Sequence, residues 1–209
     1  MISLQIIALE KSFGTKTVFS KITFDHKGQS LGIAGPNGSG KSTLLKCLGY
    51  LLRPNKGHFE WWMDGTPLDK QVFKKKLGYA APYINLYDEL NCRENLEFLA
   101  KMRHETNYES EIDHWIRKVE LAHVAEQPFG KLSTGQQQRL RLASALFHGP
   151  DILLLDEPGS NLDETGMQLI AEIVASFKQP DKLLVIASNN SNELALCERV
   201  YSIEQEAFA

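Results

Sequence analysis

A glycine-rich stretch between an apolar segment and a helix-forming segment constrains the fold more than any other part of the chain. Residues 31–34 before it form a short apolar segment, as in a buried strand, and residues 41–52 after it favour a helix. The stretch fits G-x-x-x-x-G-K-[ST] and consists of Gly35, Pro36, Asn37, Gly38, Ser39, Gly40, Lys41, Ser42 and Thr43. A strand, a tight loop and a helix in this order predict an α/β fold.

The chemistry of this loop suits a nucleoside triphosphate. Glycines let backbone N–H groups come close to phosphate oxygens, and the N-terminus of the following helix adds partial positive charge. Lys41 can reach the β- and γ-phosphates, and the Ser42 hydroxyl can bind Mg²⁺. The alternative is a glycine-rich turn that binds nothing. The lysine, the hydroxyl and the strand–loop–helix context together favour ATP with Mg²⁺.

Two carboxylates follow a second apolar segment. Residues 152–155 read as a buried strand, and Asp156 and Glu157 come directly after it. Carboxyl ends of parallel strands face one crevice, so both acids are expected beside the phosphate loop. We expect Asp156 to hold Mg²⁺ and Glu157 to orient and deprotonate the attacking water. Acidic residues can also simply end a strand, but the phosphate loop makes the catalytic interpretation stronger.

The rest of the pattern predicts a P-loop NTPase fold: a mainly parallel sheet core, an N-terminal antiparallel β part and an inserted helical subdomain. Further strands are predicted at 2–9, 18–25, 58–63, 182–187 and 199–204. Further helices are predicted at 91–103, 109–121, 136–148 and 162–178. We therefore expect one domain over 1–209, with 1–85 and 149–209 as the ATP-binding core and 86–148 as the helical subdomain.

Composition excludes some classes of function. The net charge of −3 argues against a nucleic-acid-binding protein, so no nucleic acid is expected as a partner. The apolar runs fall far short of the ~20 residues that a membrane helix needs. The 3 cysteines, Cys47, Cys92 and Cys197, have no metal-site spacing and predict reduced thiols in the cytosol.

Residues 132–139, with the sequence LSTGQQQR, resemble the signature motif of ATP-binding-cassette (ABC) ATPases. Taken alone, Ser133 could be an ordinary helix cap. The motif stands between the phosphate loop and the acidic strand end, in the order that this family shows. The three motifs stand in family order and the resemblance covers essentially the whole chain, so the chain is identified as a member of that family.

The resemblance implies roles for further residues. Phe13 takes the place of an aromatic residue that stacks on adenine, although it could also be a core phenylalanine. Ser133, Gly135 and Gln136 would reach the γ-phosphate of an ATP held by a second cassette. Residues 159–163 resemble the loop that crosses the dimer interface. ATP would thus join two cassettes head to tail, as a homodimer or in a pair with another cassette.

The same resemblance implies an ATP-binding subunit of an ABC transporter, coupled to separate transmembrane permease subunits and therefore cytoplasmic on the inner face of the membrane. The apolar and aromatic segment 83–90 lies where the family docks its membrane subunits. Two alternatives remain open. One is a soluble ABC ATPase, for example of the iron–sulfur assembly type, and the other is a slow, ATP-gated binding module.

Two positions depart from the family pattern. Pro82 replaces a glutamine that binds magnesium, and proline offers no side-chain ligand; water or Asn85 could substitute. Asn189 replaces a histidine, and its amide can donate a hydrogen bond to the γ-phosphate but cannot become cationic. We expect an ATPase that is slower than relatives with the usual residues.

Overall fold

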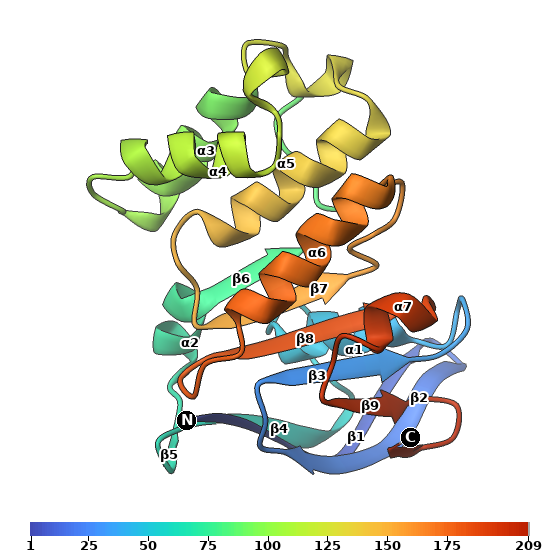
Figure 1. Cartoon of the computed structure of the whole chain (residues 1–209). Helices are drawn as coiled ribbons and strands as arrows, with labels where there is room; N and C mark the ends of the chain where they lie inside the picture. The colour runs from blue at the N-terminus through green and yellow to red at the C-terminus, as the bar shows by residue number, and fades with distance from the viewer. Residues whose placement is uncertain (209) are drawn as a thin grey trace.

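The computed structural model describes residues 1–208; residue 209, with which the predicted domain ends, lies outside the described residues. An antiparallel sheet is built mostly from the N-terminal part (Figure 1). It has 4 strands in the order β2-β1-β4-β5. They are β1 (Ile2–Phe13), β2 (Lys16–His26), β4 (Lys56–Met63) and β5 (Thr66–Pro67). The predicted N-terminal antiparallel part is confirmed.

A second sheet of 6 strands, in the order β10-β9-β3-β8-β7-β6, forms the centre of the molecule. It consists of β3 (Ser30–Ala34), β6 (Leu77–Ala80), β7 (Ile152–Asp156), β8 (Leu183–Ser188), β9 (Arg199–Ser202) and β10 (Ala207–Phe208). All its pairings are parallel except that of β10 with β9. The predicted, mainly parallel core is therefore confirmed.

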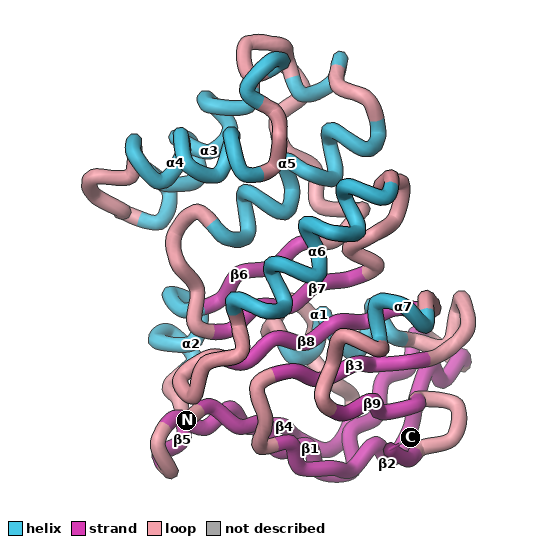
Figure 2. The backbone as a smooth tube through the Cα atoms, in the orientation of Figure 1, coloured by secondary structure: helices cyan, strands magenta, loops and turns pink. Residues whose placement is uncertain are grey.

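The helices cover the central sheet on both faces, as Figure 2 shows. They are α1 (Lys41–Leu48), α2 (Lys70–Lys76), α3 (Cys92–Arg103), α4 (Glu109–Lys118), α5 (Thr134–Leu146), α6 (Glu164–Ser176) and α7 (Ser191–Leu194). Short 3₁₀ turns lie at Ala122–Val124 and Phe129–Lys131. Helix α1 packs between the two sheets, whereas α3 to α6 pack on the other face of the parallel sheet.

Strand β7 shows why both faces of this sheet are covered. All its residues are buried. Ile152 and Leu154 pack into the cluster that contains α1, and Leu153 and Leu155 pack into the cluster that contains α3 to α6. Successive side chains of a strand point to opposite faces, so a continuous apolar run needs apolar cover on both sides.

Helix α1 is shorter than predicted, because it ends at Leu48 rather than at residue 52. Gly49 follows it, and Tyr50 takes a left-handed backbone conformation with φ of 56°. The buried indole N–H of Trp61 donates to the Leu48 carbonyl at 3.0 Å and satisfies a group that the helix end leaves free. A tertiary contact thus fixes a boundary that the sequence pattern did not show.

The observed ends of the other helices lie closer to the predicted ones than the end of α1 does. Helix α4 ends at Lys118 instead of 121, since Glu120 is left-handed with φ of 59°. Helix α6 begins at Glu164 instead of 162, because Asp163 accepts a hydrogen bond from the Gly166 N–H at 2.9 Å and caps it. Helix α2 was not predicted. It is a short basic segment whose buried residue is Phe73.

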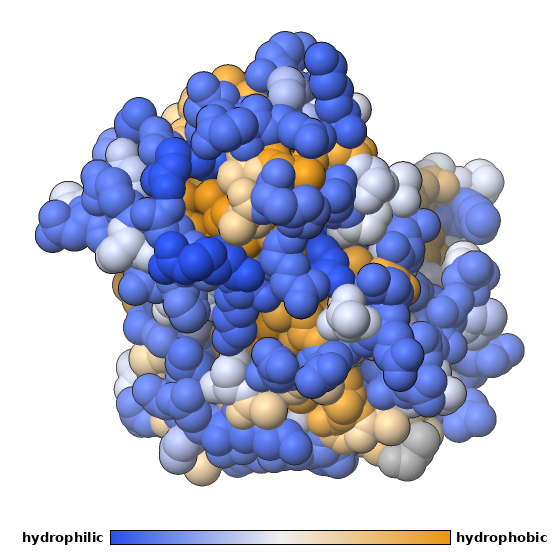
Figure 3. Space-filling model, turned by 45° about the horizontal axis from the view of Figure 1, so that its top comes forward, coloured by the Kyte–Doolittle hydropathy of each residue, from blue (hydrophilic) through white to orange (hydrophobic). Residues whose placement is uncertain are grey.

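Within residues 1–208, no helix combines the length and the apolar character that crossing a membrane requires. On the face that Figure 3 shows, hydrophilic side chains predominate and apolar atoms appear in smaller areas between them.

The buried His26 makes stability depend on pH. Neither of its ring nitrogens has a hydrogen-bonding partner among the described residues. Burial, helped by the positive charge of Arg199, lowers the pKa of His26 to about 4. The folded protein therefore holds this ring neutral at pH values where the unfolded chain protonates it. Its contribution to stability is complete above about pH 6.5 and falls as the pH drops toward 4.

We expect His26→Leu to remove this pH dependence. Between pH 7 and pH 5, the free energy of unfolding of the wild type should fall by on the order of 2 kcal/mol more than that of the variant. Urea denaturation at both pH values measures the difference. The exposed His58, changed in the same way, is the control, and equal losses in wild type and His26→Leu would contradict the prediction.

Candidate functional site

The phosphate loop connects the end of β3 to the start of α1, as predicted. Gly38 and Gly40 have φ values of 83° and 101°, which side chains rarely adopt. A Cβ atom at Gly40 would also lie 2.7 Å from Cγ1 of Val18. Both glycines are therefore required by the loop conformation, and the backbone can wrap around a ligand at the N-terminus of α1.

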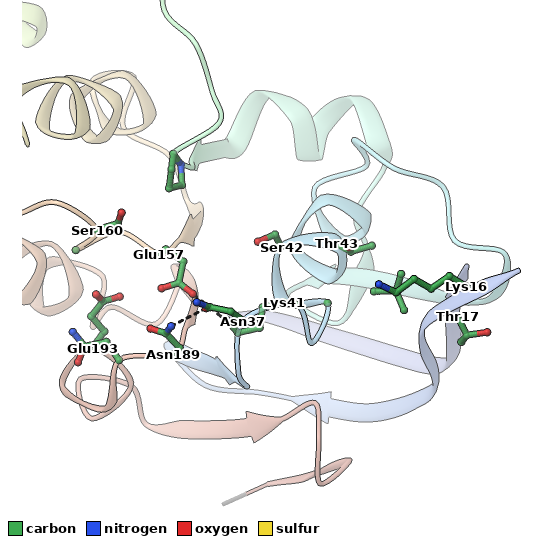
Figure 4. Close-up of a pocket in the computed structure, with 16 residues that line it drawn as sticks. Lys16, Thr17, Asn37, Lys41, Ser42, Thr43, Glu157, Ser160, Asn189 and Glu193 are labelled. Carbon is green, nitrogen blue, oxygen red and sulfur yellow. Dashed lines mark hydrogen bonds and ion pairs between the residues drawn. The ribbon is translucent and has the colours of Figure 1, made fainter. Parts of the chain in front are cut away.

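A cavity of about 720 Å³ lies over this loop. Its lining combines the loop with residues that follow other strands, and Figure 4 shows Glu157, Asn189 and Asn37 grouped apart from Lys16 and Thr17. The lining residues are Lys16, Thr17, Val18, Asn37, Gly38, Gly40, Lys41, Ser42, Thr43, Pro82, Glu157, Gly159, Ser160, Asn189, Asn190 and Glu193. The structure thus brings the loop and the predicted residues Glu157 and Asn189 into one cavity. Pro36 and Ser39 line a neighbouring cavity.

Lys41 is held by the loop itself. Its ammonium group donates to the carbonyl oxygens of Gly35 at 2.8 Å and Pro36 at 3.2 Å. It also forms an ion pair with Glu157, with Nζ 3.3 Å from Oε1. The lysine and the candidate base therefore neutralise one another, and a phosphate group entering the loop would compete with these contacts for the ammonium.

Glu157 sits in an unfavourable backbone conformation with φ of 46°. Its N–H donates to the Ala187 carbonyl at 2.8 Å, which holds it to β8. The Ser188 hydroxyl is 3.4 Å from its Oε2. Strained residues of this kind persist only where neighbouring contacts hold them, and they are frequent at functional sites.

Asp156 lies behind the cavity lining and is 1% exposed. Burial raises the pKa of Asp156, while the Ser42 and Tyr83 hydroxyls lie close enough to oppose that rise. These hydroxyls are not well aligned, and within residues 1–208 neither carboxylate oxygen has a partner with full hydrogen-bond geometry. A buried carboxylate with free oxygens beside a serine hydroxyl suits a hard cation such as Mg²⁺. The described residues contain no cluster of 3 or more His, Cys, Asp or Glu suited to a metal ion, so phosphate and water would complete such a site.

Tyr83 is a site residue that the sequence interpretation missed. Its hydroxyl hydrogen-bonds to that of Tyr79 and faces Asp156, and the Lys46 ammonium lies 3.7 Å from the centre of its ring. The alternative that Asn85 replaces the missing glutamine is not supported, because Asn85 is exposed and does not line the cavity. Pro82 does line it. Only the folded structure places the hydroxyl of the partly exposed Tyr83 beside Asp156.

Asn189 lies at the cavity mouth, after β8. Its side-chain N–H donates to the Asn37 oxygen at 2.8 Å, and this bond joins the loop after β8 to the phosphate loop. The amide is exposed, so it can exchange this partner for a ligand oxygen.

The signature residues line a different cavity, of about 640 Å³. Ser133 caps α5: its hydroxyl accepts from the Gln136 N–H at 3.2 Å, and the Gln136 side chain accepts from the Ser133 N–H at 2.9 Å. The helix-cap interpretation of Ser133 is therefore confirmed. Gly135, Asn161 and Asp163 line the same cavity, which shares no lining residue with the cavity over the phosphate loop.

Two buried side chains tie the signature helix to the loop after β7, and the sequence pattern did not reveal them. Gln138 donates to the Pro158 carbonyl at 3.0 Å. Arg139 contacts Glu120 at 2.7 Å, Asp163 at 3.0 Å and Thr165 at 2.7 Å. They hold the start of α5 in a fixed place relative to the acidic strand end.

Phe13 is 53% exposed and lies outside the lining of the cavity. It pairs with Lys16 across the β1–β2 hairpin, and the Lys11 ammonium lies 4.9 Å from its ring centre. The exposed ring is not a core phenylalanine, so that alternative is excluded. Lys16 and Thr17, which do line the cavity, were not predicted; their position directly after the Gly14 turn was the available signal.

The protein-family model described as ABC transporter matches residues 20–160. An ABC transporter ATP-binding protein of Methanocaldococcus jannaschii is 30% identical and is covered over 72% of its length by 94% of this chain. The lantibiotic transport ATP-binding protein SrtF of Streptococcus pyogenes is 32% identical, with 91% of this chain and 82% of the relative covered.

Solved structures agree with these relatives. A dimeric bacterial ABC transporter cassette has a TM-score of 0.83 at 25% identity, over 95% of this chain and 93% of that one. A cassette bound to ADP and phosphate, described as a post-hydrolysis state, has a TM-score of 0.80 at 26% identity, over 95% of this chain and 93% of that one. The chain therefore belongs to the ABC transporter family, in which it is an ATP-binding subunit that hydrolyses ATP.

Proposed function

We propose that this cassette binds Mg²⁺–ATP between its phosphate loop and the signature helix of a second cassette, and that hydrolysis there drives separate membrane subunits. The observation that carries the proposal is the separation of the two cavities. One contains Lys41, Glu157 and Asn189, and the other contains Ser133 and Gly135. The N-terminus of α5, which favours an anion, therefore lies outside the cavity that would hold the ATP of its own chain.

A head-to-tail pair places each signature cavity over the other chain's phosphate loop and completes two sites. This matches the head-to-tail arrangement expected from the signature motif, and a similar cassette has been solved as a dimer. In this arrangement 1–85 and 149–209 form the ATP-binding core, and 86–148 forms the helical subdomain that presents Ser133, Gly135 and Gln136. Either a second copy or another cassette can be the partner.

Each chain's own residues have distinct tasks in the reaction. Lys41 leaves the Gly35 and Pro36 carbonyls for the β- and γ-phosphates, and this breaks its ion pair with Glu157. The freed carboxylate orients a water molecule and accepts its proton as the water attacks the γ-phosphorus. The bond from the γ-phosphorus to the β–γ bridging oxygen breaks, so ADP leaves and inorganic phosphate forms. Asn189 donates to a γ-phosphate oxygen. Asp156 and Ser42 would hold Mg²⁺, which would neutralise charge on the phosphates. Phe13 lies outside the cavity lining but pairs with Lys16, which lines it, and would contact an adenine held there.

The membrane subunits are proposed to be separate chains, so the cassette works in the cytoplasm on the inner face of the membrane. Segment 83–90 supports this, because Tyr83 and Tyr87 are large exposed aromatic side chains on it. Pro82 and Asn189 favour a second candidate, a module that closes on ATP and hydrolyses it slowly.

Replacement of Glu157 tests the assignment of the base. We expect Glu157→Gln to lower ATP turnover at least about 100-fold, since the amide cannot accept the proton. The variant should form dimers on gel filtration with ATP and not without it. Glu172→Gln, an exposed substitution on α6, is the control. Full turnover in Glu157→Gln would refute the assignment, and failure to dimerise with bound ATP would refute the paired arrangement.

The two departures from the family pattern give a second test. Pro82→Gln supplies a ligand for Mg²⁺, and Asn189→His supplies a group that can become cationic. We expect each change to raise steady-state turnover by about 3-fold or more. Unchanged rates in both variants would show that these positions do not slow hydrolysis.

Tyr83 gives a third test, of the metal site. Its hydroxyl faces Asp156, so Tyr83→Phe should loosen the placement of that carboxylate. We expect the Mg²⁺ concentration for half-maximal turnover to rise by about 3-fold or more. Loss of a group that orients a metal ligand commonly weakens metal binding by more than this. Tyr87→Phe, an exposed tyrosine of the same segment, is the matched control. An equal magnesium requirement in both variants would contradict the role.

A further inference from the structure

Glu193 is a buried carboxyl group with no role in the function proposed above. It lies in the short helix α7 after β8, lines the cavity over the phosphate loop, and is 2% exposed. Its Oε2 has no hydrogen-bonding partner among the described residues. Burial raises the pKa of Glu193, and the nearby charge of Glu157 raises it further. A buried acid without a cation destabilises a fold unless its contacts offset the cost, so these contacts need an explanation.

The carboxyl group reaches across to the loop that follows β7. A Cβ atom at Gly159 would lie 2.5 Å from Oε1 of Glu193, so the glycine leaves room for the carboxyl oxygen. The Gly159 backbone N–H and the Ser188 hydroxyl both lie within reach of the carboxyl group and stabilise its charged form. Glu193, which lies after β8, therefore contacts the loop that follows β7 and links these two parts of the chain by a non-covalent bridge.

Ser188 extends this contact to Glu157. Its hydroxyl accepts from the Asn190 N–H at 2.9 Å and lies 3.4 Å from Oε2 of Glu157. Glu157 has a strained backbone, with φ of 46°, and its carbonyl accepts from the Ser160 N–H at 3.1 Å. A strained residue of this kind persists where neighbouring contacts hold it. The bond to Ala187 lies on the sheet side. The contact of Glu193 with Gly159 lies on the loop side, two residues after Glu157.

The bridged loop also reaches the signature. A Cβ atom at Gly135 would lie 3.0 Å from the Asn161 carbonyl oxygen, so the loop from Gly159 to Asn161 runs directly beside the start of α5. A shift of Gly159 would therefore move both the candidate base and the surface that meets the second cassette.

We propose that Glu193 is a positioning residue that fixes the loop after β7 against α7 and so aims Glu157 at the attacking water. This inference rests on the proposed role of Glu157. It assigns no contact with ATP to Glu193. Loss of the bridge should therefore reduce the rate of the chemical step and leave nucleotide binding nearly unchanged, because misplacement of a catalytic group by about 1 Å can cost 100-fold.

Steady-state kinetics of Glu193→Ala and Glu193→Gln test the proposal. We expect Glu193→Ala to lower kcat at least about 10-fold with the KM for ATP changed less than about 3-fold. Glu193→Gln keeps the size of the side chain and one acceptor oxygen for the Gly159 N–H, so it should retain kcat within about 3-fold. Binding of a fluorescent ATP analogue and thermal unfolding are measured on both variants, so that a folding defect is recognised.

Gly159→Ala approaches the same contact from the other side. Its methyl group would displace Glu193 Oε1 and the Met167 sulfur, which also lies 2.5 Å away. We expect a lower kcat from Gly159→Ala alone and little further loss when it is added to Glu193→Ala, because both remove one contact. Losses that simply multiply would overturn the proposal, as would a Glu193→Ala variant with normal kcat or with a raised KM alone.

Glu157→Gln is measured beside these variants. If it loses turnover and Glu193→Ala does not, the role of Glu193 is wrong and the proposed function stands. If Glu157→Gln keeps turnover, the assignment of the base fails, and the positioning role fails with it.

Discussion

The in-register parallel pairing of β3, β8 and β7 is the constraint on which the site depends. Ala34 pairs with Ser188, and Asp156 pairs with Ala187. All three strands therefore end at one edge, where the phosphate loop, Asp156 and Ser188 meet. Their apolar residues fill clusters on both faces, so a slip by one residue would turn each strand's side chains to the opposite face. Packing of the core thus places the polar groups.

Features set by neighbouring residues could be predicted from the sequence. The phosphate loop and the start of the helix predicted at 91–103 depend on local backbone requirements, and both form as predicted. Asn91 and Glu94 form a capping box there. The end of α1 could not be predicted, because the Trp61 indole reaches it from another sheet. Tyr83 and Glu193 were missed for the same reason. Nothing near them in the chain indicates that Tyr83 faces Asp156 or that Glu193 faces Gly159.

The position of the signature helix is fixed within one chain, and this affects how two chains can pair. Gln138 and Arg139 fix α5 to the loop after β7, so the two cavities of one chain keep a set spacing. Under the proposed function, the signature cavity of each chain must lie over the phosphate loop of its partner, so the spacing of the two cavities has to be the same in both chains. Rigid coupling within the chain is what would let two such surfaces meet at both sites at once.

The left-handed backbone of Glu157 carries a consequence for how this sequence can change. Glycine and asparagine tolerate that conformation better than glutamate, and relief of the strain would stabilise the fold by roughly 1 kcal/mol. Substitutions that increase stability at this position therefore replace the glutamate and remove its carboxylate. A descendant freed from the need to hydrolyse ATP would lose Glu157 early, while its core and its phosphate loop persisted.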